Sequence, residues 1–288
     1  MEHLVARLRA AGCVFAEDEA RILFEAATAD GATDDARLES LVAARVGGLP
    51  LEHLVGWAEL DGRRWGVAPG VFVPRQRSEL LVRDATARAL SDATDAPVLL
   101  VDLCCGCGAL GGAVAARLLA AGHDVDVHAA DVDPVATACA HGNLVALATE
   151  ALPGRLSAQT YTGDLAAPLP DGVRGRVDVL VANAPYVPTE AIGMMPPEAR
   201  EHEPHAALDG GDDGLAILRR VIDLAPALLR PGGHLLVETG EAQVSAAVGH
   251  LEAAGLIPTV LTDDDLGATA LVGTLPPTWA GPIRTPAR

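Results

Sequence analysis

The spacing of apolar residues changes once along this 288-residue chain. Up to about residue 56, apolar positions recur every three or four residues, which is the spacing of amphipathic helices. From about residue 65, short apolar runs alternate with alanine-rich helical stretches. Short and nearly continuous apolar strands are typical of a parallel sheet covered by helices on both faces. The pattern therefore predicts a small N-terminal helical domain followed by a doubly wound α/β domain.

The expected elements divide the chain into four parts. The helices expected in the first part cover roughly residues 2–12, 16–29 and 34–46. The clearest strand candidates are residues 98–103, 125–130, 177–182 and 234–238. We predict a helical domain at 1–66, a linker at 67–92, an α/β domain at 93–274 and a loose proline-containing tail at 275–288.

Composition and charge narrow the setting. Half of the residues are hydrophobic, which is enough for a large core. The net charge is −18 and every basic residue is Arg, so we expect no basic face for gripping nucleic acid. We see no signal peptide and no apolar run of the ~20 residues that span a bilayer. The five cysteines are odd in number and clustered, which predicts free thiols in a cytoplasmic protein that we expect to be monomeric.

A glycine-rich loop follows the strand candidate at 98–103. Asp102 lies at the end of that strand, and Gly106 and Gly108 come next, ahead of a helical stretch at 113–120. Glycines let a backbone turn tightly and approach a ligand, and a helix N-terminus offers free N–H groups. Asp131, which ends the following strand, could accept hydrogen bonds from both hydroxyls of a ribose. With Gly111 the loop also satisfies G-x-G-x-x-G, so this element alone leaves NAD open, as well as a turn without any ligand.

Three of the cysteines lie within the same loop. Cys104 and Cys107 have C-x-x-C spacing, which raises a redox or metal-binding interpretation. A structural zinc site needs four ligands, and the sequence holds no second cysteine pair. We interpret these two residues and Cys105 as small side chains in a crowded turn. His202 and His205 flank a Glu-Pro dipeptide in an expected loop, and we predict no metal there.

The most informative residues are Asn183-Ala184-Pro185-Tyr186, at the end of the strand candidate at 177–182. An amide or base nitrogen is a poor nucleophile because its lone pair is delocalised. The Asn183 side-chain oxygen and the Ala184 main-chain carbonyl could each accept one N–H and turn the lone pair toward a sulfonium methyl. Tyr186 could pack on the flat face of the acceptor. Such catalysis consists of positioning and of hydrogen bonds that strengthen in the transition state. This clamp favours S-adenosylmethionine over NAD.

These motifs occur in an order that resembles the HemK/PrmC family of protein-(glutamine-N5) methyltransferases, over about residues 4–274. The resemblance is carried by residues 45–56, 72–79, 102–108, 131, 163–165, 183–186, 203–204, 207–215, 231–233 and 238. It implies a Rossmann-like class I S-adenosylmethionine-dependent methyltransferase domain preceded by a substrate-recognition domain. It also implies that Asp164 and Leu165 lie beside the adenine. The implied partner is a peptide-chain release factor, methylated on its Gly-Gly-Gln motif.

The chain departs from the family pattern at several positions. Ala184 stands where the family has the first Pro of Asn-Pro-Pro-Tyr, so the loop loses one rigid φ angle but keeps the carbonyl. In the family's Pro-Arg-Pro-Glu-Thr-Glu segment, Gln76, Arg77 and Ser78 replace Pro, Glu and Thr. The Arg usual near residues 265–270 is absent. The chain resembles the divergent actinobacterial branch, whose substrate is not settled, at least as well as the main branch.

Three classes of function therefore compete. A protein glutamine methyltransferase accounts for the helical domain. An N-methyltransferase of a small molecule, or of adenine in nucleic acid, would use the same clamp, although the acidic charge opposes nucleic acid. A nicotinamide-dependent enzyme would use only the glycine loop. A binding protein without activity is a further alternative if Ala184 has spoiled the clamp.

Overall fold

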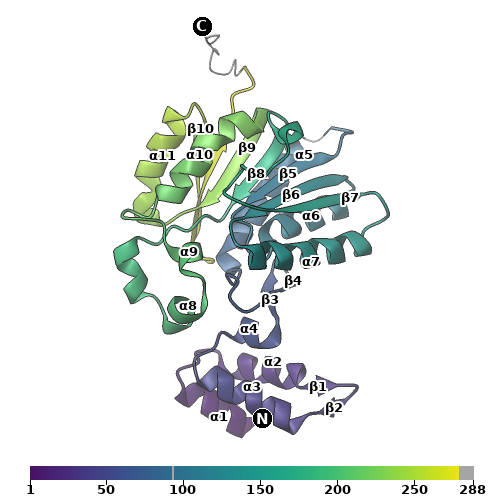
Figure 1. The fold of residues 1–288 in the computed structure, drawn as a ribbon, viewed down its shortest axis with the longest axis vertical. Coiled ribbons are helices and arrows are strands. Elements are labelled where there is room, and N and C mark those ends of the chain that lie inside the picture. The colour runs from purple at the N-terminus through teal and green to yellow at the C-terminus, as the bar shows by residue number, and fades with distance from the viewer. Residues whose placement is uncertain (93, 279–288) are drawn as a thin grey trace.

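The computed structural model describes residues 1–92 and 94–278, and its N-terminal part is a small helical domain (Figure 1). Its elements are α1 (Glu2–Ala10), α2 (Ala16–Ala26), β1 (Thr28–Ala29), β2 (Ala32–Thr33), α3 (Asp35–Val46) and α4 (Leu51–Val55). The predicted helices are confirmed, except that 28–29 pair with β2 as a short hairpin. Leu8, Leu23 and Val42 pack at the centre of this domain and are fully buried.

The second part of the chain is built on a seven-stranded sheet. Its strands are β5 (Val98–Leu103), β6 (Val125–Asp131), β7 (Leu156–Thr162), β8 (Val177–Ala182), β9 (Leu229–Glu238), β10 (Ile257–Asp263) and β11 (Ala268–Thr274). The strand order is β10-β11-β9-β8-β5-β6-β7, and β11 runs in the direction opposite to the other six strands. The predicted doubly wound α/β architecture is confirmed.

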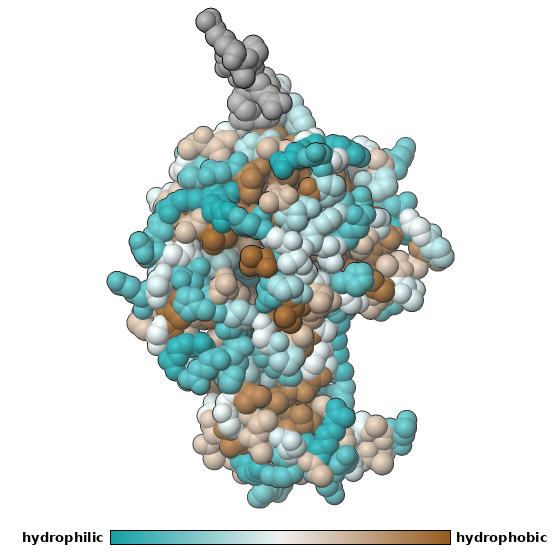
Figure 2. All heavy atoms as spheres, in the orientation of Figure 1, coloured by the Kyte–Doolittle hydropathy of each residue, from teal (hydrophilic) through white to brown (hydrophobic). Residues whose placement is uncertain are grey.

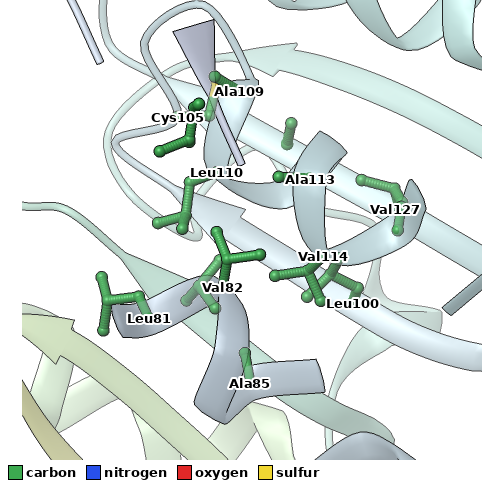
Figure 3. Close-up of a cluster of buried hydrophobic side chains, with 14 of the residues drawn as sticks. Leu81, Val82, Ala85, Leu100, Cys105, Ala109, Leu110, Ala113, Val114 and Val127 are labelled. Atoms are coloured by element: carbon green, nitrogen blue, oxygen red, sulfur yellow. The ribbon is translucent and has the colours of Figure 1, made fainter. Parts of the chain in front are cut away.

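Helices cover both faces of this sheet. One layer contains α5 (Glu79–Ser91), α6 (Ala109–Ala120) and α7 (Pro134–Glu150); the other contains α10 (Ala216–Leu228) and α11 (Val244–Ala253). Figure 3 shows the first layer from inside, where Val82 of α5 and Val114 of α6 pack beside Leu100 of β5. Burying apolar surface stabilises the folded state by about 25 cal/mol per Å². The packing of these two helix layers on the sheet is therefore the main source of stability.

Strand prediction succeeded at the sheet centre, failed at its edges and also missed β11, a largely buried strand between β10 and β9. All six residues of β5 are buried, as the continuous apolar pattern indicated. The edge strands β7 and β10 alternate between partly buried and exposed residues, so neither presents the apolar run that was used to find strands. The strand expected at 234–238 begins earlier, at Leu229, which pairs with Val177; the register with β8 is irregular between Leu229 and His234, and regular pairing resumes at His234.

The apolar packing divides the chain elsewhere than the predicted boundaries 1–66, 67–92 and 93–274. The hairpin of β3 (Trp57–Leu60) and β4 (Arg63–Gly66) inserts Trp65 into the core of the α/β domain. A Cβ at Gly112 of α6 would lie 2.5 Å from the Trp65 ring, which shows how closely the hairpin packs. Helix α5, within the predicted linker, covers the sheet. We propose a boundary near Gly56, which ends α4 in a left-handed conformation.

The predicted tail starts inside the fold. Leu275 is buried, and its backbone is hydrogen-bonded to Gly232 and Gly233. The remainder of the predicted tail, from residue 279 onward, lies outside the described residues.

A long connection between β8 and α10 reaches the helical domain. It contains η3 (Thr189–Met194), α8 (Pro197–His202) and α9 (His205–Leu208); other short 3₁₀ turns are η1 (Gln76–Ser78), η2 (Asp171–Val173) and η4 (Glu241–Gln243). The buried Arg45 guanidinium donates to Glu19 of α2 at 2.6 Å and to Glu198 of α8 at 2.7 Å. One side chain thus joins the helical domain to the connection that follows the Asn183 motif. Figure 2 shows hydrophobic residues exposed on the helical domain where it approaches the α/β domain.

No helix in residues 1–92 or 94–278 is long and apolar enough to cross a membrane.

Candidate active site

A cavity of about 290 Å³ opens at the carboxyl ends of the central strands. The crossover connections run in opposite directions on either side of β5 and β8, and ligands of open α/β sheets bind at such a point. The cavity is lined by the glycine loop, by 130–133 after β6, by 164–165 after β7 and by Asn183 and Pro185 after β8. The sequence-predicted cofactor residues Asp102, Cys104, Cys105, Gly106, Cys107, Asp131, Asp164 and Leu165 all line it; Gly108 begins α6 beside it.

Asp102 is the most unusual ionisable group of the cavity. Its side chain is 1% exposed, and Oδ2 accepts the Gly111 N–H at 2.9 Å. Its Oδ1 has no hydrogen-bond partner among the residues that the structure describes. Burial raises the pKa of the Asp102 carboxyl to about 7. A Cβ on Gly111 would lie 2.8 Å from Oδ2, so the third glycine of G-x-G-x-x-G is needed for this contact.

Residues with positive φ angles line or adjoin the same cavity. Gly106 and Gly108 have φ of +54° and +74°, and a Cβ at Gly108 would meet Ala140 of α7 at 2.9 Å. Cys104 and Leu165 also adopt positive φ, at 55° and 48°, which is uncommon for residues with such side chains. Strained conformations of this kind persist where the surrounding structure holds them, and they cluster at ligand sites.

Asp131 holds the glycine loop from the neighbouring strand. Its Oδ2 accepts the Gly106 N–H at 2.9 Å, and its Oδ1 accepts the Asp133 N–H at 3.0 Å. Burial raises the pKa of this carboxyl above its usual range. Each carboxylate oxygen has a second lone pair, so Asp131 can still accept hydrogen bonds from a ligand. Asp164 is exposed and pairs with Arg220 of α10 at 2.6 Å.

The loop cysteines are thiols in a packed environment. Cys105 and Cys107 are buried in the core between α6 and the sheet, and Figure 3 shows Cys105 beside Ala109. Burial raises the pKa of Cys107 to about 12 and moves that of Cys104 upward as well. A thiolate is the nucleophile and the metal ligand, so these side chains are poorly suited to either role. Among residues 1–92 and 94–278 no group of three or more His, Cys, Asp and Glu side chains could hold a metal ion.

A second, smaller hollow adjoins the cavity on the far side of Asn183. Asn183 and Pro185 line both spaces, whereas Ala184 and Tyr186 line only the smaller one. Phe72, Met195 and Leu208 contribute apolar walls, and Arg75 and Arg77 lie among its lining residues. The four residues predicted to form the clamp therefore lie together where the two spaces share lining residues.

A side-chain network that sequence reasoning missed surrounds this junction. Glu238, at the end of β9, is 3% exposed and accepts from Arg77 Nε at 2.6 Å and from Ser78 Oγ at 2.7 Å. Tyr186 donates its hydroxyl to the same carboxylate at 2.8 Å and also contacts the Arg77 guanidinium. Burial and the Glu238 charge push the pKa of the Tyr186 phenol well above its usual range, so it stays protonated.

The sequence contained a signal for Glu238, but no role was predicted for it. Glu238 ends a buried apolar strand with a charge, as Asp102 does, and such a residue at the carboxyl edge of a parallel sheet is a site candidate. Arg77 and Ser78 were treated only as departures from the family segment. The structure places both of them against the predicted clamp.

The stretch 207–215 supports the backbone that follows Asn183. Val187 pairs with Asp209, and Gly210 donates its N–H to the Val187 carbonyl at 2.8 Å. Gln243 donates to the Tyr186 carbonyl at 2.9 Å. A Cβ at Gly214 would lie 2.3 Å from that carbonyl, so the glycine allows the close approach.

Comparison with solved structures shows which fold the chain shares. The human Mettl16 catalytic domain, solved in complex with MAT2A 3′UTR hairpin 6, matches with a TM-score of 0.54 at 14% identity, covering 84% of this chain and 84% of that one. A methyltransferase from Pyrococcus furiosus matches with a TM-score of 0.50, covering 75% and 90%. The fold is that of the class I S-adenosylmethionine-dependent methyltransferases. No family model matches the chain.

Comparison with curated proteins defines the family. A release factor glutamine methyltransferase of Geobacter sulfurreducens is 34% identical, over 83% of this chain and 77% of that protein. One of Mycobacterium tuberculosis is 34% identical over 80% and 71%. A 4-amino-L-phenylalanine/4-methylamino-L-phenylalanine methyltransferase of Streptomyces pristinaespiralis is 36% identical over 72% and 66%. The chain belongs to the release factor glutamine methyltransferase family, also called HemK/PrmC, as its motifs indicated.

Proposed function

We propose that this protein transfers a methyl group from S-adenosylmethionine to the side-chain amide nitrogen of a protein glutamine. The leading candidate is the Gly-Gly-Gln motif of a peptide-chain release factor, the substrate class in the names of the Geobacter and Mycobacterium relatives. One observation carries the proposal: Asn183 lines both the large cavity and the smaller hollow, so a donor and an acceptor could meet at its side chain.

The large cavity fits the cofactor. The unpartnered, buried Oδ1 of Asp102 is suited to a positively charged donor, which the methionine ammonium would supply. Asp131 would hold the ribose hydroxyls, and Asp164 and Leu165 would lie beside the adenine. The cradle of 104–108, with its positive φ angles, would let the backbone approach the ligand closely. When bound, S-adenosylmethionine supplies an electrophilic methyl group on a sulfonium.

The residues of the chain then orient the acceptor nitrogen. The Asn183 Oδ1 and the Ala184 carbonyl accept its two N–H groups, and the Tyr186 ring packs on the flat amide. These hydrogen bonds strengthen as positive charge develops on nitrogen, so they stabilise the transition state more than the ground state. Because transfer is achieved by positioning, no strong base is needed before it.

A small-molecule acceptor is the second candidate function. The Streptomyces pristinaespiralis relative carries the name of an amino-acid methyltransferase. Arg75 and Arg77 both line the smaller hollow; each pairs with a buried carboxylate, Glu203 and Glu238, and the carboxylate of a free amino acid would meet their remaining N–H donors. The net charge of −18 favours either candidate over a nucleic acid.

The test uses purified enzyme with isotope-labelled S-adenosylmethionine, a release factor of its own host and 4-amino-L-phenylalanine as separate acceptors. Mass spectrometry should show one added methyl on the Gln side chain of the Gly-Gly-Gln motif, and none on a Gln→Ala variant of the factor. Methylation of the free amino acid alone would replace the first candidate by the second.

Binding of the cofactor is tested separately by titration calorimetry. We expect S-adenosylhomocysteine to bind and NAD not to bind. Tighter binding of NAD would overturn the methyltransferase assignment of the cavity.

A further inference from the structure

The orientation of the Asn183 amide is decisive for the proposed clamp. A side-chain amide can present its oxygen or its NH₂ to a partner by a half-turn about its last torsion angle. Only the oxygen can accept the N–H of an acceptor amide. An Asn183 side chain turned the other way would oppose one donor with another.

Glu238 sets the direction of the hydrogen bonds that lead to Asn183. As a carboxylate it can only accept, and it receives hydrogen bonds from Arg77, Tyr186 and Ser78. The Ser78 hydroxyl has a single hydrogen, and the 2.7 Å contact with Glu238 Oε2 uses it. Toward its other neighbour, Ser78 Oγ is therefore left as an acceptor.

That other neighbour is Asn183. Its Nδ2 lies 3.4 Å from Ser78 Oγ and can donate to it, whereas Oδ1 at the same place would face a lone pair. With Nδ2 held toward Ser78, Oδ1 is directed away from the network. Ser78 is 3% exposed and, like Asn183, lines the large cavity.

We propose that Ser78 and Glu238 are positioning residues that hold the Asn183 amide with its oxygen toward the acceptor. This inference rests on the proposed function, because it assigns a role within that site. Arg77 and Tyr186 complete the arrangement by occupying Oε1 of Glu238, which leaves Oε2 for Ser78. Neither Ser78 nor Glu238 needs to touch the reacting atoms.

The first experiment measures turnover with a release factor as acceptor. Ser78→Ala should lower kcat about tenfold, the worth of one hydrogen bond, with little change in the affinity for S-adenosylhomocysteine. Ser78→Thr keeps a hydroxyl and should recover most of the loss. Glu238→Gln introduces a donor toward Ser78 and should lower kcat as Ser78→Ala does. Ser91→Ala, at the exposed far end of α5, is the matched control.

A double-mutant cycle separates positioning from general damage. If Ser78 acts through Asn183, Ser78→Ala should have no further effect on kcat once Asn183 is Ala. The same fold loss in both backgrounds would overturn the proposal, as would wild-type kcat in Ser78→Ala. Thermal melting identifies any variant that loses the fold. If Ser78→Ala does not fold, the comparison of Ser78→Thr with the wild type remains informative.

A readout without turnover distinguishes failure of this inference from failure of the proposed function. Nuclear magnetic resonance of the Asn183 side-chain NH₂, assigned by its loss in Asn183→Ala, reports its hydrogen exchange. We expect slowed exchange in the wild type and Ser78→Thr, and faster exchange in Ser78→Ala. Equal exchange in all three overturns the inference whatever the substrate. Slowed wild-type exchange without any methylated glutamine supports the inference and removes the proposed substrate.

Discussion

The two halves of the candidate site are built in different ways. In the cofactor half, Asp102 accepts the backbone N–H of Gly111 in the first turn of α6, and Asp131 accepts that of Gly106 in the glycine loop. In the acceptor half, side chains bind side chains, and Glu238 is 160 and 161 positions away from Ser78 and Arg77. The first half shapes the backbone around a ligand. The second orients functional groups.

This difference separates affinity from turnover. A substitution in the cofactor half should mainly change how tightly the cofactor binds, because its contacts shape the cradle. A substitution in the acceptor half should mainly change kcat, because its hydrogen bonds gain strength only as the transition state forms. Two predictions test this separation directly, and two more test the Asp102 carboxyl and the loop cysteines of the cofactor half.

Asn183→Ala should have the largest effect. It removes an acceptor from the transition state, and by analogy with the loss of one oxyanion-hole donor it should lower kcat on the order of 10²–10³-fold. Affinity for S-adenosylhomocysteine should change far less. The control is Ala184→Pro, which restores the family residue and keeps the carbonyl. Steady-state kinetics with near-normal kcat for Asn183→Ala would refute the clamp.

Asp131→Ala should produce the opposite pattern. Losing hydrogen bonds to a charged group costs about 1.5–3 kcal/mol, which corresponds to roughly 10–150-fold in affinity for S-adenosylhomocysteine. At saturating cofactor, kcat should fall much less. Calorimetry and kinetics on this variant and on the exposed Asp265→Ala control measure both quantities. A fall in kcat without a loss of affinity would contradict the assignment of Asp131 to cofactor binding.

Asp102→Asn should change the pH dependence of stability. The folded-state pKa of Asp102 is about 7, above its usual value near 4, so the folded protein holds a proton that the unfolded chain releases. Stability of the free protein should therefore fall as pH rises from about 4 to 7. The Asp102→Asn variant should lack this pH dependence, and at pH 8 its free energy of unfolding should exceed that of the wild type by on the order of 1–3 kcal/mol. Urea unfolding at pH 5 and pH 8 tests it, and parallel profiles would contradict it.

The cysteine substitutions should have the smallest effect. Cys107→Ser and Cys104→Ala should change cofactor affinity by less than about tenfold, or ~1.4 kcal/mol, because the thiols fill space and are protonated. Calorimetry measures the affinity, and elemental analysis of the wild type checks for zinc. Stoichiometric zinc or redox-dependent activity would show that the loop cysteines have a chemical role.

Much of the fold could be predicted from the chain because its signals are local. The buried strand at 98–103 is apolar except for Asp102, and its successor at 125–131 differs from expectation by one residue. The edge strands β7 and β10 were not predicted because about half of their residues face solvent, which interrupts the apolar pattern. The hairpin at 57–66 was assigned to the helical domain because nothing near Trp65 in the sequence shows that Gly112 leaves room for it.

The sequence by itself determined the cofactor loop and the Asn183 motif, since glycine freedom, strand ends and short carboxylate-to-backbone contacts depend on neighbouring residues. Only the tertiary structure decided that Glu238 faces Ser78 and that the Glu238 carboxylate accepts hydrogen bonds from both Tyr186 and Arg77. It also decided that Arg45 joins two domains. The contacts of Glu238 depend on the order of β8 and β9 in the sheet and on the placement of α5 across them, whereas the Arg45 contact depends on where α8 lies against the helical domain. Pairings between elements so far apart are set by packing, which no local pattern encodes.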